Sequence, residues 1–406
     1  MSKYLNVFNT LAEYQAFSAS TEYVQPNVAL VKETNVLYYD YGDNKPKVDM
    51  SDFKVESQET SVGGDKYGNS AITKINYIPN GITSLQGAFG GFISLVSVLE
   101  IPSSVTNMSS TFIGCSSLVN APEIPNSVTD MTYTFQGCTS LVNAPMIPSS
   151  VTNIESTFRD CTSLANAPKI PNGVTSLNYT FRNCTSLVNA PVIPSSVTNM
   201  NNTFYGCSSL VNAPEIPNSV TDMGFTFSGC SSLVNAPVIP DSVTNILSTF
   251  RDCTSLVNAP KISSGVTNIE STFRNCSSLV TAPEIPSGVT SMYNTFNGCS
   301  NLVTAPKIPS GVKDMSYTFN GCSSLVTAPE IPSGVKDMYG TFGGCTSLKE
   351  VTFLHTTPPT YRNTLIDCSK LETIYVPDKS VNAYKTATGW LEFASNIKPL
   401  SSKPSE

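Results

Sequence analysis

The chain has 406 residues, a net charge of −7 and only 13% charged residues. Low charge at an ordinary apolar content indicates a surface rich in Ser, Thr and Asn, and the lack of a basic stripe excludes a nucleic-acid-binding protein. No apolar run approaches the roughly 18 residues that a spanning helix needs, so membrane insertion is excluded as well.

Residues 1–50 predict a small N-terminal module of mixed α and β structure. The run LAEYQAF at 11–17 predicts a short amphipathic helix, and the apolar runs at 28–31 and 36–39 predict a β-hairpin. Because the first residues hold no apolar block of about 7–15 residues, we expect no Sec signal peptide. Residues 51–71 are rich in Gly, Asp, Lys and Ser and predict a linker.

The string QPNVALVKETNVLYYDY at 25–41 resembles N-terminal modules in virion proteins of crAss-like gut phages. The resemblance implies that residues 1–50 anchor the chain to other virion proteins of a capsid or tail.

The cysteines follow a constant step of 23 residues, which marks an internal repeat. Counted from each Cys as position zero, apolar residues fall at +3, +6, +9, +13, +16 and +20, a spacing that fits neither an amphipathic helix nor an alternating strand. It predicts a repeat solenoid that makes one turn per 23 residues, with each inward side chain stacked on its counterpart in the next turn. The column at +20 extends from Phe89 to Leu365 and predicts about 13 coils. We expect the solenoid over residues 72–350, followed by an irregular coil and a cap at 351–406.

Two prolines per unit, such as Pro145 and Pro148, lack the N–H that a sheet needs. We therefore expect sparse secondary structure: a short strand near 140–143, an extended corner, and a helical or 3₁₀ turn around the Thr-Phe-x-Gly-Cys segment. At the C-terminal end, Trp390 is expected to cover the last coil together with Tyr384 and Phe393, since solenoid ends need caps. Stacking of Trp390 on a sugar is the alternative.

The units L-x-x-A-P-x-I-P-x-S-V-T-x-M-x-x-T-F-x-G-C resemble the BspA-like leucine-rich repeat, most closely at 72–89. The inserted Ala-Pro pair departs from that pattern. The resemblance extends over about residues 72–400 and implies a leucine-rich-repeat-like, right-handed superhelix with short parallel strands, used for binding surfaces, glycans or proteins without catalysis.

The single cysteine of each coil predicts a buried column of free thiols, although an even number also permits disulfides. No CxxC occurs, and His355 is the only histidine, so we expect no metal site. No phosphate loop, activated nucleophile or paired carboxylates stand out, so we expect no catalytic residues, no cofactor and no enzymatic activity.

Candidate binding residues lie in the columns that vary between coils, at −6, −5 and −2 from each Cys. Variation confined to outward columns is typical of a recognition surface, and aromatic and Arg side chains are enriched at binding hot spots. Free drift of surface residues is the alternative. The candidates are Tyr133, Tyr179, Tyr205, Phe225, Tyr293, Tyr317, Tyr339, Arg159, Arg182, Arg251 and Arg274. Glu155 and Arg159, four residues apart, also fit a local ion pair, and the column at +8, which includes Met146, is a candidate for packing against another subunit.

Three functions follow from these patterns. The first is a phage fibre or decoration protein on the virion surface, assembled in the host cytoplasm, which binds a host cell-surface glycan or protein and could form a homotrimer. The second is a BspA-like adhesin on the bacterial cell surface. The third is a structural protein that cements a capsid or tail.

Overall fold

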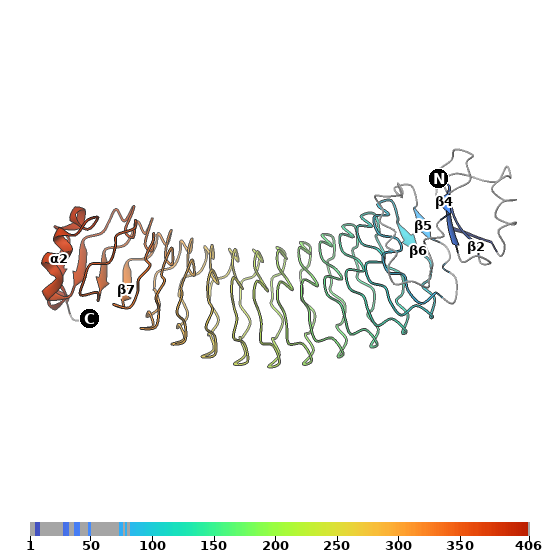
Figure 1. The fold of residues 1–406 in the computed structure, drawn as a ribbon, viewed down its shortest axis with the longest axis horizontal. Coiled ribbons are helices and arrows are strands. Elements are labelled where there is room, and N and C mark those ends of the chain that lie inside the picture. Colours follow the sequence, from blue (N-terminus) through green and yellow to red (C-terminus); the bar gives the residue numbers. More distant parts are fainter. Residues whose placement is uncertain are drawn as a thin grey trace. The chain divides into compact units, whose positions relative to one another are not determined.

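The computed structural model describes residues 73–75, 78 and 82–404, together with the backbone of four strands nearer the N-terminus. The chain divides into two compact units, Met1–Val197 and Thr198–Glu406. Within each unit the chain winds in coils with little regular secondary structure (Figure 1). The sparse structure expected from the prolines is therefore confirmed.

The N-terminal strands are β1 (Leu5–Phe8), β2 (Asn27–Val31), β3 (Val36–Asp40) and β4 (Val48–Asp49), which form one sheet in that order. Strands β2 and β3 are antiparallel, with Val28 opposite Tyr39, so the hairpin is confirmed. The helix expected at 11–17 and the linker at 51–71 lie outside the described residues. The independent N-terminal module stays a prediction.

The core of each unit consists of stacked columns, one residue of each kind per coil. Leu at +3, Val at +13, Phe at +20 and Cys are fully buried in most coils, and Ile at +9 is nearly so. Neighbouring Phe rings lie parallel, with centroids 5.8 Å apart between Phe135 and Phe158. The expectation fails at +6, where Ala144 is only half-buried, because the Pro that follows places this residue at a corner. The number of coils stays a prediction.

Regular strands occur mainly where the Ala-Pro pair is missing. The coils at the start of the repeats carry β5 (Lys74–Ile75) and β6 (Ser97–Val98), which are parallel. Coils with the Ala-Pro pair show single bridges instead, such as Asn120 with Asn143 and Asn212 with Asn235. Towards the C-terminus a parallel sheet forms in the order β10-β9-β8-β7; its members are β7 (Thr327–Ile331), β8 (Glu350–Phe353), β9 (Thr373–Val376) and β10 (Ile397–Pro399).

The Thr-Phe-x-Gly-Cys segment forms the expected single turns of the 3₁₀ type, but these turns do not join into a continuous helix. Backbone N–H groups alternate in their partners: Ser110 and Phe112 donate to Thr132 and Thr134 of the next coil, at 2.8 and 2.9 Å. The intervening N–H groups close turns within the coil, as Thr111 does to Met108 O at 3.1 Å. Residues at −5 and −1 have positive φ, for example 56° at Ser110, which stops helix propagation. This surface, positions −8 to −1 of each coil, is called the turn face below.

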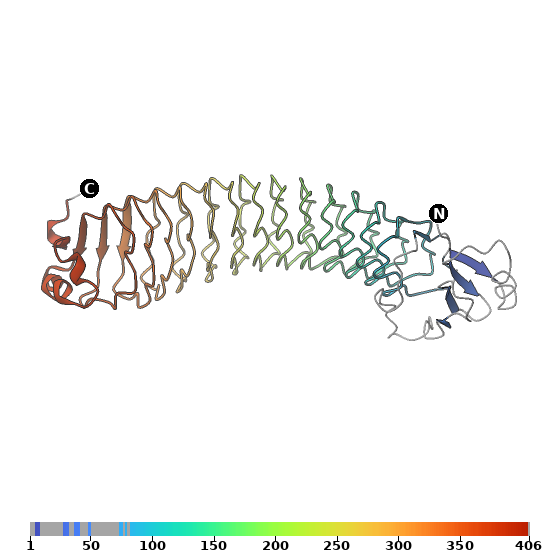
Figure 2. The ribbon, with the colours of Figure 1, turned by 90° about the horizontal axis from the view of Figure 1, so that it is seen from above.

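The C-terminal cap follows the last coil (Figures 1 and 2). Trp390 is fully buried, makes edge contacts with Phe353 and Tyr384, and donates from Nε1 to Pro359 O at 2.8 Å. Its capping role is confirmed, whereas full burial leaves no face for a sugar. The cap contains η3 (Asp378–Ser380), α2 (Val381–Thr386), η4 (Leu391–Phe393) and η5 (Leu400–Ser402).

Candidate functional site

The turn face is the candidate interface, because the predicted binding residues all lie on it. Its backbone is rigid, since each turn is bonded both within its coil and to the next. A buried Thr column at −4 stiffens it further: Thr134 Oγ1 lies 2.9 Å from Met108 O and 2.7 Å from Met131 O. The outward side chains are therefore carried at fixed intervals by a preorganised backbone, which reduces the entropic cost of binding.

Three candidate tyrosines meet on the turn face of the second unit. Tyr317 contacts Tyr293 edge-on, with ring centroids 6.4 Å apart, and Tyr339 at 5.1 Å with the rings tilted. Tyr293 and Tyr339 are 39% and 41% exposed. Partial burial and the neighbouring phenols of Tyr339 and Tyr293 raise the pKa of Tyr317, so the hydroxyl stays neutral at physiological pH. We call these three residues the tyrosine cluster.

A glycine beside the tyrosine cluster makes room for the Tyr317 ring. Gly340 has φ +58°, and a Cβ there would lie 3.1 Å from the Tyr317 ring. The coil also has glycine at 343, the position that carries Arg in four other coils. The lack of a side chain at Gly340 thus allows the Tyr317 ring to lie close to this coil, beside Tyr339.

Two candidate arginines meet around one tyrosine in the first unit. The guanidinium carbons of Arg159 and Arg182 lie 5.8 and 5.5 Å from the Tyr179 ring centroid. Arg159 Nε lies 3.3 Å from Asp160 Oδ2, and Asn183 Nδ2 donates to Asp160 Oδ1 at 2.7 Å. The local pair expected between Glu155 and Arg159 gives way to this contact, because the segment is not helical and residues four apart do not share a face. Glu155 instead accepts from Asn178 Nδ2 at 3.3 Å.

The second unit repeats the arginine arrangement. Arg251 Nε donates to Asp252 Oδ2 at 3.1 Å, and Asn275 Nδ2 donates to Asp252 Oδ1 at 2.7 Å. Arg274, in the coil of Asn275, is half-buried, and its buried Nε has no hydrogen-bond partner among the residues described. These Asp and Asn side chains were not among the residues singled out from the sequence, although they replace glycine at −1 in all four coils that carry Arg at −2; Asp367, which follows Ile366, is a further case.

The remaining candidates are not gathered into either group. Tyr133, Tyr205 and Phe225 are half-buried on separate coils of the turn face. Half-burial throughout these columns reflects contact with the equivalent residues of adjacent coils. Each exposes part of its ring to solvent.

The cysteine column is buried, except that Cys368 is half-buried, and no disulfide links its thiols within the described residues. Several thiols donate a weak hydrogen bond to a backbone carbonyl of the previous coil. Cys138 Sγ, for example, donates to Phe112 O at 3.2 Å. Burial raises the pKa of the Cys115 and Cys299 thiols to about 12. These thiols therefore lack the thiolate that nucleophilic or metal-binding chemistry requires.

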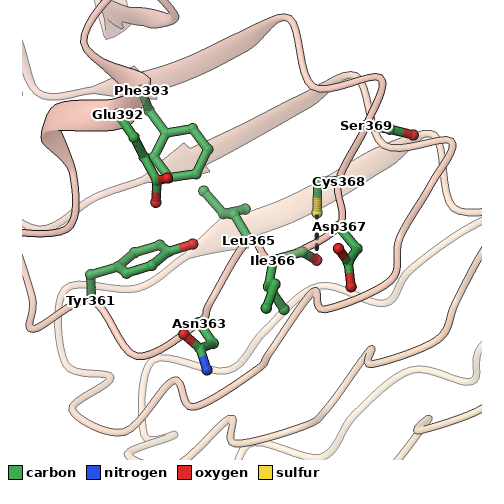
Figure 3. A pocket seen from close by; sticks show the side chains of 9 residues that line it. All are labelled: Tyr361, Asn363, Leu365, Ile366, Asp367, Cys368, Ser369, Glu392 and Phe393. Atoms are coloured by element: carbon green, nitrogen blue, oxygen red, sulfur yellow. Dashed lines mark hydrogen bonds between the residues drawn. The ribbon is translucent and has the colours of Figure 1, made fainter.

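A pocket of about 440 Å³ opens at the end of the turn face (Figure 3). The pocket exists because the cap, and not another coil, follows this coil. The turn of a further coil therefore does not pack over Tyr361, Asn363 and Asp367. Burial and the nearby Glu392 carboxylate raise the pKa of Tyr361 to about 12. His355 lies elsewhere, is buried, and donates from Nε2 to Val335 O at 2.8 Å, which indicates a structural role.

The column at +8 forms a separate surface at the proline corner. Met146 and Val192 are 81% and 85% exposed, and charged residues alternate with them. In the described part of the chain no helix is long and apolar enough to cross a membrane. Within that same part, no group of three or more His, Cys, Asp or Glu is placed to hold a metal ion.

Among solved structures, the chain is similar to a leucine-rich repeat protein from Bacteroides ovatus, with 25% identity over 94% of this chain and 100% of that one, at a TM-score of 0.68. A leucine rich cell surface protein from Faecalibacterium prausnitzii matches with 23% identity over 81% and 87%, at a TM-score of 0.49. No curated protein matches the chain. None of these likenesses supports the virion resemblance of residues 25–41.

The family model for the BspA type leucine rich repeat region matches residues 60–188, 178–303 and 270–388. These matches extend over far more than half of the chain and include both units. The protein therefore belongs to the BspA-type leucine-rich repeat family.

Proposed function

We propose that the protein is a non-enzymatic adhesin of the BspA type at a bacterial cell surface, which binds a glycan or protein on another surface through its turn face. The family assignment supports this reading over a virion protein. The tyrosine cluster carries the proposal: three aromatic side chains from successive coils meet on a rigid backbone, with two of them substantially exposed. Exposed aromatic groups of this kind are typical anchors of binding surfaces.

The chemistry of the turn face favours binding over catalysis. The arginines of the turn face contact aromatic rings and carboxylates. Outside the turn face, the Cys115 thiol is buried and protonated, and His355 is engaged with the backbone. The virion and cementing readings predict that residues 1–50 or the turn face are buried against other chains. A homotrimer likewise stays a prediction.

Location and binding test the proposal separately. Immunogold electron microscopy with antibody against the second unit should label bacterial envelopes; label on free virions alone would contradict the surface adhesin.

For binding, the full chain is applied to an array of host glycans and extracellular proteins and to whole cells. The triple variant Tyr293→Ala, Tyr317→Ala, Tyr339→Ala should lose at least tenfold in affinity. The control Met146→Ala, Val192→Ala changes exposed apolar residues at the proline corner and should bind normally. Equal binding by the tyrosine variant would remove the cluster from the site.

A further inference from the structure

The turn face repeats with a longer period than one coil. Three of the four aromatic residues at −5, namely Tyr133, Phe225 and Tyr317, are spaced by 92 residues, which is four coils; Tyr179 is the fourth. The same interval relates the polar pairs of the next two coils: Arg159–Asp160 recurs as Arg251–Asp252, and Arg182–Asn183 recurs as Arg274–Asn275. We call one such set a four-coil block. One block lies in the first unit and one in the second; a third begins at Tyr317 without the arginines.

The two complete blocks share one contact network, although Tyr179 of the first block is replaced by Ser271 in the second. In each, Arg contacts the Asp that follows it, at 3.3 Å in the first block and 3.1 Å in the second. In each, the Asn of the next coil donates to that Asp at 2.7 Å. Repetition of a contact network, and not only of residue types, argues against drift of unconstrained surface positions.

The backbone gives an independent reason to assign a role to these side chains. Asp160, Asn183, Asp252 and Asn275 have φ between 57° and 61°, a region in which a side chain is disfavoured. Other coils meet the same requirement with glycine, as at Gly137 and Gly229. The polar side chains are therefore retained at a conformational cost; in the coils of the two blocks they follow Arg, whereas Asp367, beside the cap, follows Ile366.

Resting on the proposed function, we infer that each complete block binds a segment of a linear polysaccharide with carboxylate-bearing sugars. Guanidinium groups bind carboxylates through paired, charge-assisted hydrogen bonds. Arg274 is suited to this, because its Nε lacks a partner in the described structure and its own coil carries Asn at −1 in place of Asp. The Asp–Asn contact can exchange hydrogen bonds with sugar hydroxyls, and the aromatic ring one coil away offers a face for a sugar ring.

The period favours a polymer over a folded protein. In the second unit, successive Phe rings lie 5.5 to 5.8 Å apart, so a block extends about 20 Å along the coils, the length of several sugar rings. A regular polymer presents equivalent groups along its length, so each block can bind an equivalent segment of it. A folded protein partner does not repeat in this way.

Isothermal titration calorimetry of the full chain tests the inference. The probes are oligosaccharides of polygalacturonate, alginate and hyaluronan, together with polygalacturonate oligomers whose carboxylates have been reduced to alcohols. At least one carboxylate series should bind at two equivalent sites per chain, and reduction should weaken binding at least tenfold. Each pair of substitutions, Arg159→Gln with Arg182→Gln or Arg251→Gln with Arg274→Gln, should leave one site of unchanged affinity. All four together should abolish binding.

The matched control, Lys169→Gln with Lys261→Gln, removes one positive charge from each unit at the proline corner and should leave binding unchanged. The inference is overturned if no carboxylate series binds, if reduced oligomers or poly-glutamate bind equally well, or if the arginine variants bind like the wild type. The variant Asp160→Gly with Asn183→Gly tests whether these two side chains serve only the stability of the fold. Lower thermal stability with unchanged binding would contradict the inference. Cell binding that survives in the fourfold arginine variant but not in the tyrosine variant would refute this inference while leaving the proposed adhesin intact.

Discussion

At the scale of single residues, the cysteines show how burial fixes chemistry. Their thiols lie in the core and face backbone carbonyls, as Cys253 Sγ does to Phe227 O at 3.1 Å. Burial disfavours the thiolate, which raises the pKa. The thiols serve as small apolar side chains with a weak donor, and the column contributes to packing in the way that the Leu and Phe columns do.

This burial predicts a loss of stability in alkali. In the unfolded chain the thiols ionise near their ordinary pKa of 9.0, whereas in the folded chain the pKa of Cys115 and Cys299 is about 12. Between these values the unfolded state has lost protons that the folded state keeps, so the free energy of unfolding should fall as pH rises. Urea unfolding from about pH 8 to about pH 11 measures the slope.

The variant Cys253→Ala, Cys276→Ala lacks two buried thiols and should show a shallower fall over the same range. A profile that stays flat in the wild type, or that is identical in the variant, would contradict a protonated thiol column.

The sequence predicted the core residues but not all of the hydrogen-bonding ones. Fixed spacing identifies Leu, Val, Phe and Cys as inward, because only a stacked column needs the same apolar residue every 23 positions. Thr134 looked like a surface residue, since its hydroxyl gives no sign in sequence that it is buried against two carbonyls. The aromatic and Arg candidates were found by their variation, whereas Asp252 and Asn275 become visible only when their shared contact is known.

At the scale of elements, the turn face differs most from expectation. A Thr-Phe-x-Gly-Cys run has the local turns of a 3₁₀ helix, which explains the prediction. Positive φ at two positions per coil reverses the chain direction between turns and leaves alternate N–H groups free to reach the next coil. Propensity alone could not reveal this, because Ser156 and Tyr179 adopt positive φ without being glycine.

Substitution at Gly137 tests the importance of that backbone conformation. Its φ is +73°, and a Cβ would meet only ordinary contacts with Gly114, at 3.5 and 3.6 Å. Gly137→Ala should therefore destabilise the protein by about 1–2 kcal/mol through conformation alone. Gly137→Asn should cost less, because Asn tolerates this region and occupies the equivalent position at 183. Urea unfolding compares the two; equal stability of the Ala variant would remove the constraint.

The short strands follow from proline placement. Strand β8 has the sequence EVTF without proline and forms a regular ladder with β9, whereas the Ala-Pro coils keep isolated bridges, one of them at the Asn or Thr that precedes the pair. The effect of the prolines on the strands could be predicted from the sequence, because a residue without an N–H cannot donate a hydrogen bond in a sheet. The strand boundaries could not, because β7 keeps Pro329 and accommodates it with an irregular register.

At the scale of the whole molecule, stability should depend on neighbour contacts and on the cap. Trp390 packs against Phe353, Tyr361 and Tyr384 at the end of the second unit. Trp390→Ala should lower stability by about 3–5 kcal/mol. Trp390→Phe should retain most of the stability, because it keeps an aromatic ring and loses chiefly the hydrogen bond to Pro359. Thermal unfolding measures both variants; a small effect of Ala would mean that the cap is dispensable.

Coil removal tests the repeat itself. Deletion of residues 277–299 joins Cys276 to Ser300 and keeps every column in phase, so the shortened chain should fold with a modest loss of stability. Deletion of only 280–299 shifts the columns and should leave the region unfolded. Circular dichroism and protease resistance distinguish the two. Failure of the in-phase deletion would show that individual coils are not interchangeable.

The alternating hydrogen bonds of the turn face have an evolutionary consequence. Every interior coil presents the same carbonyls on one side and the same N–H groups on the other, so neighbouring coils match whichever copies they are. Near-identical coding segments recombine readily with one another out of register. An exchange that adds or drops whole coils creates no mismatched junction. Such genes can therefore change the number of binding positions between generations without passing through a protein that fails to fold.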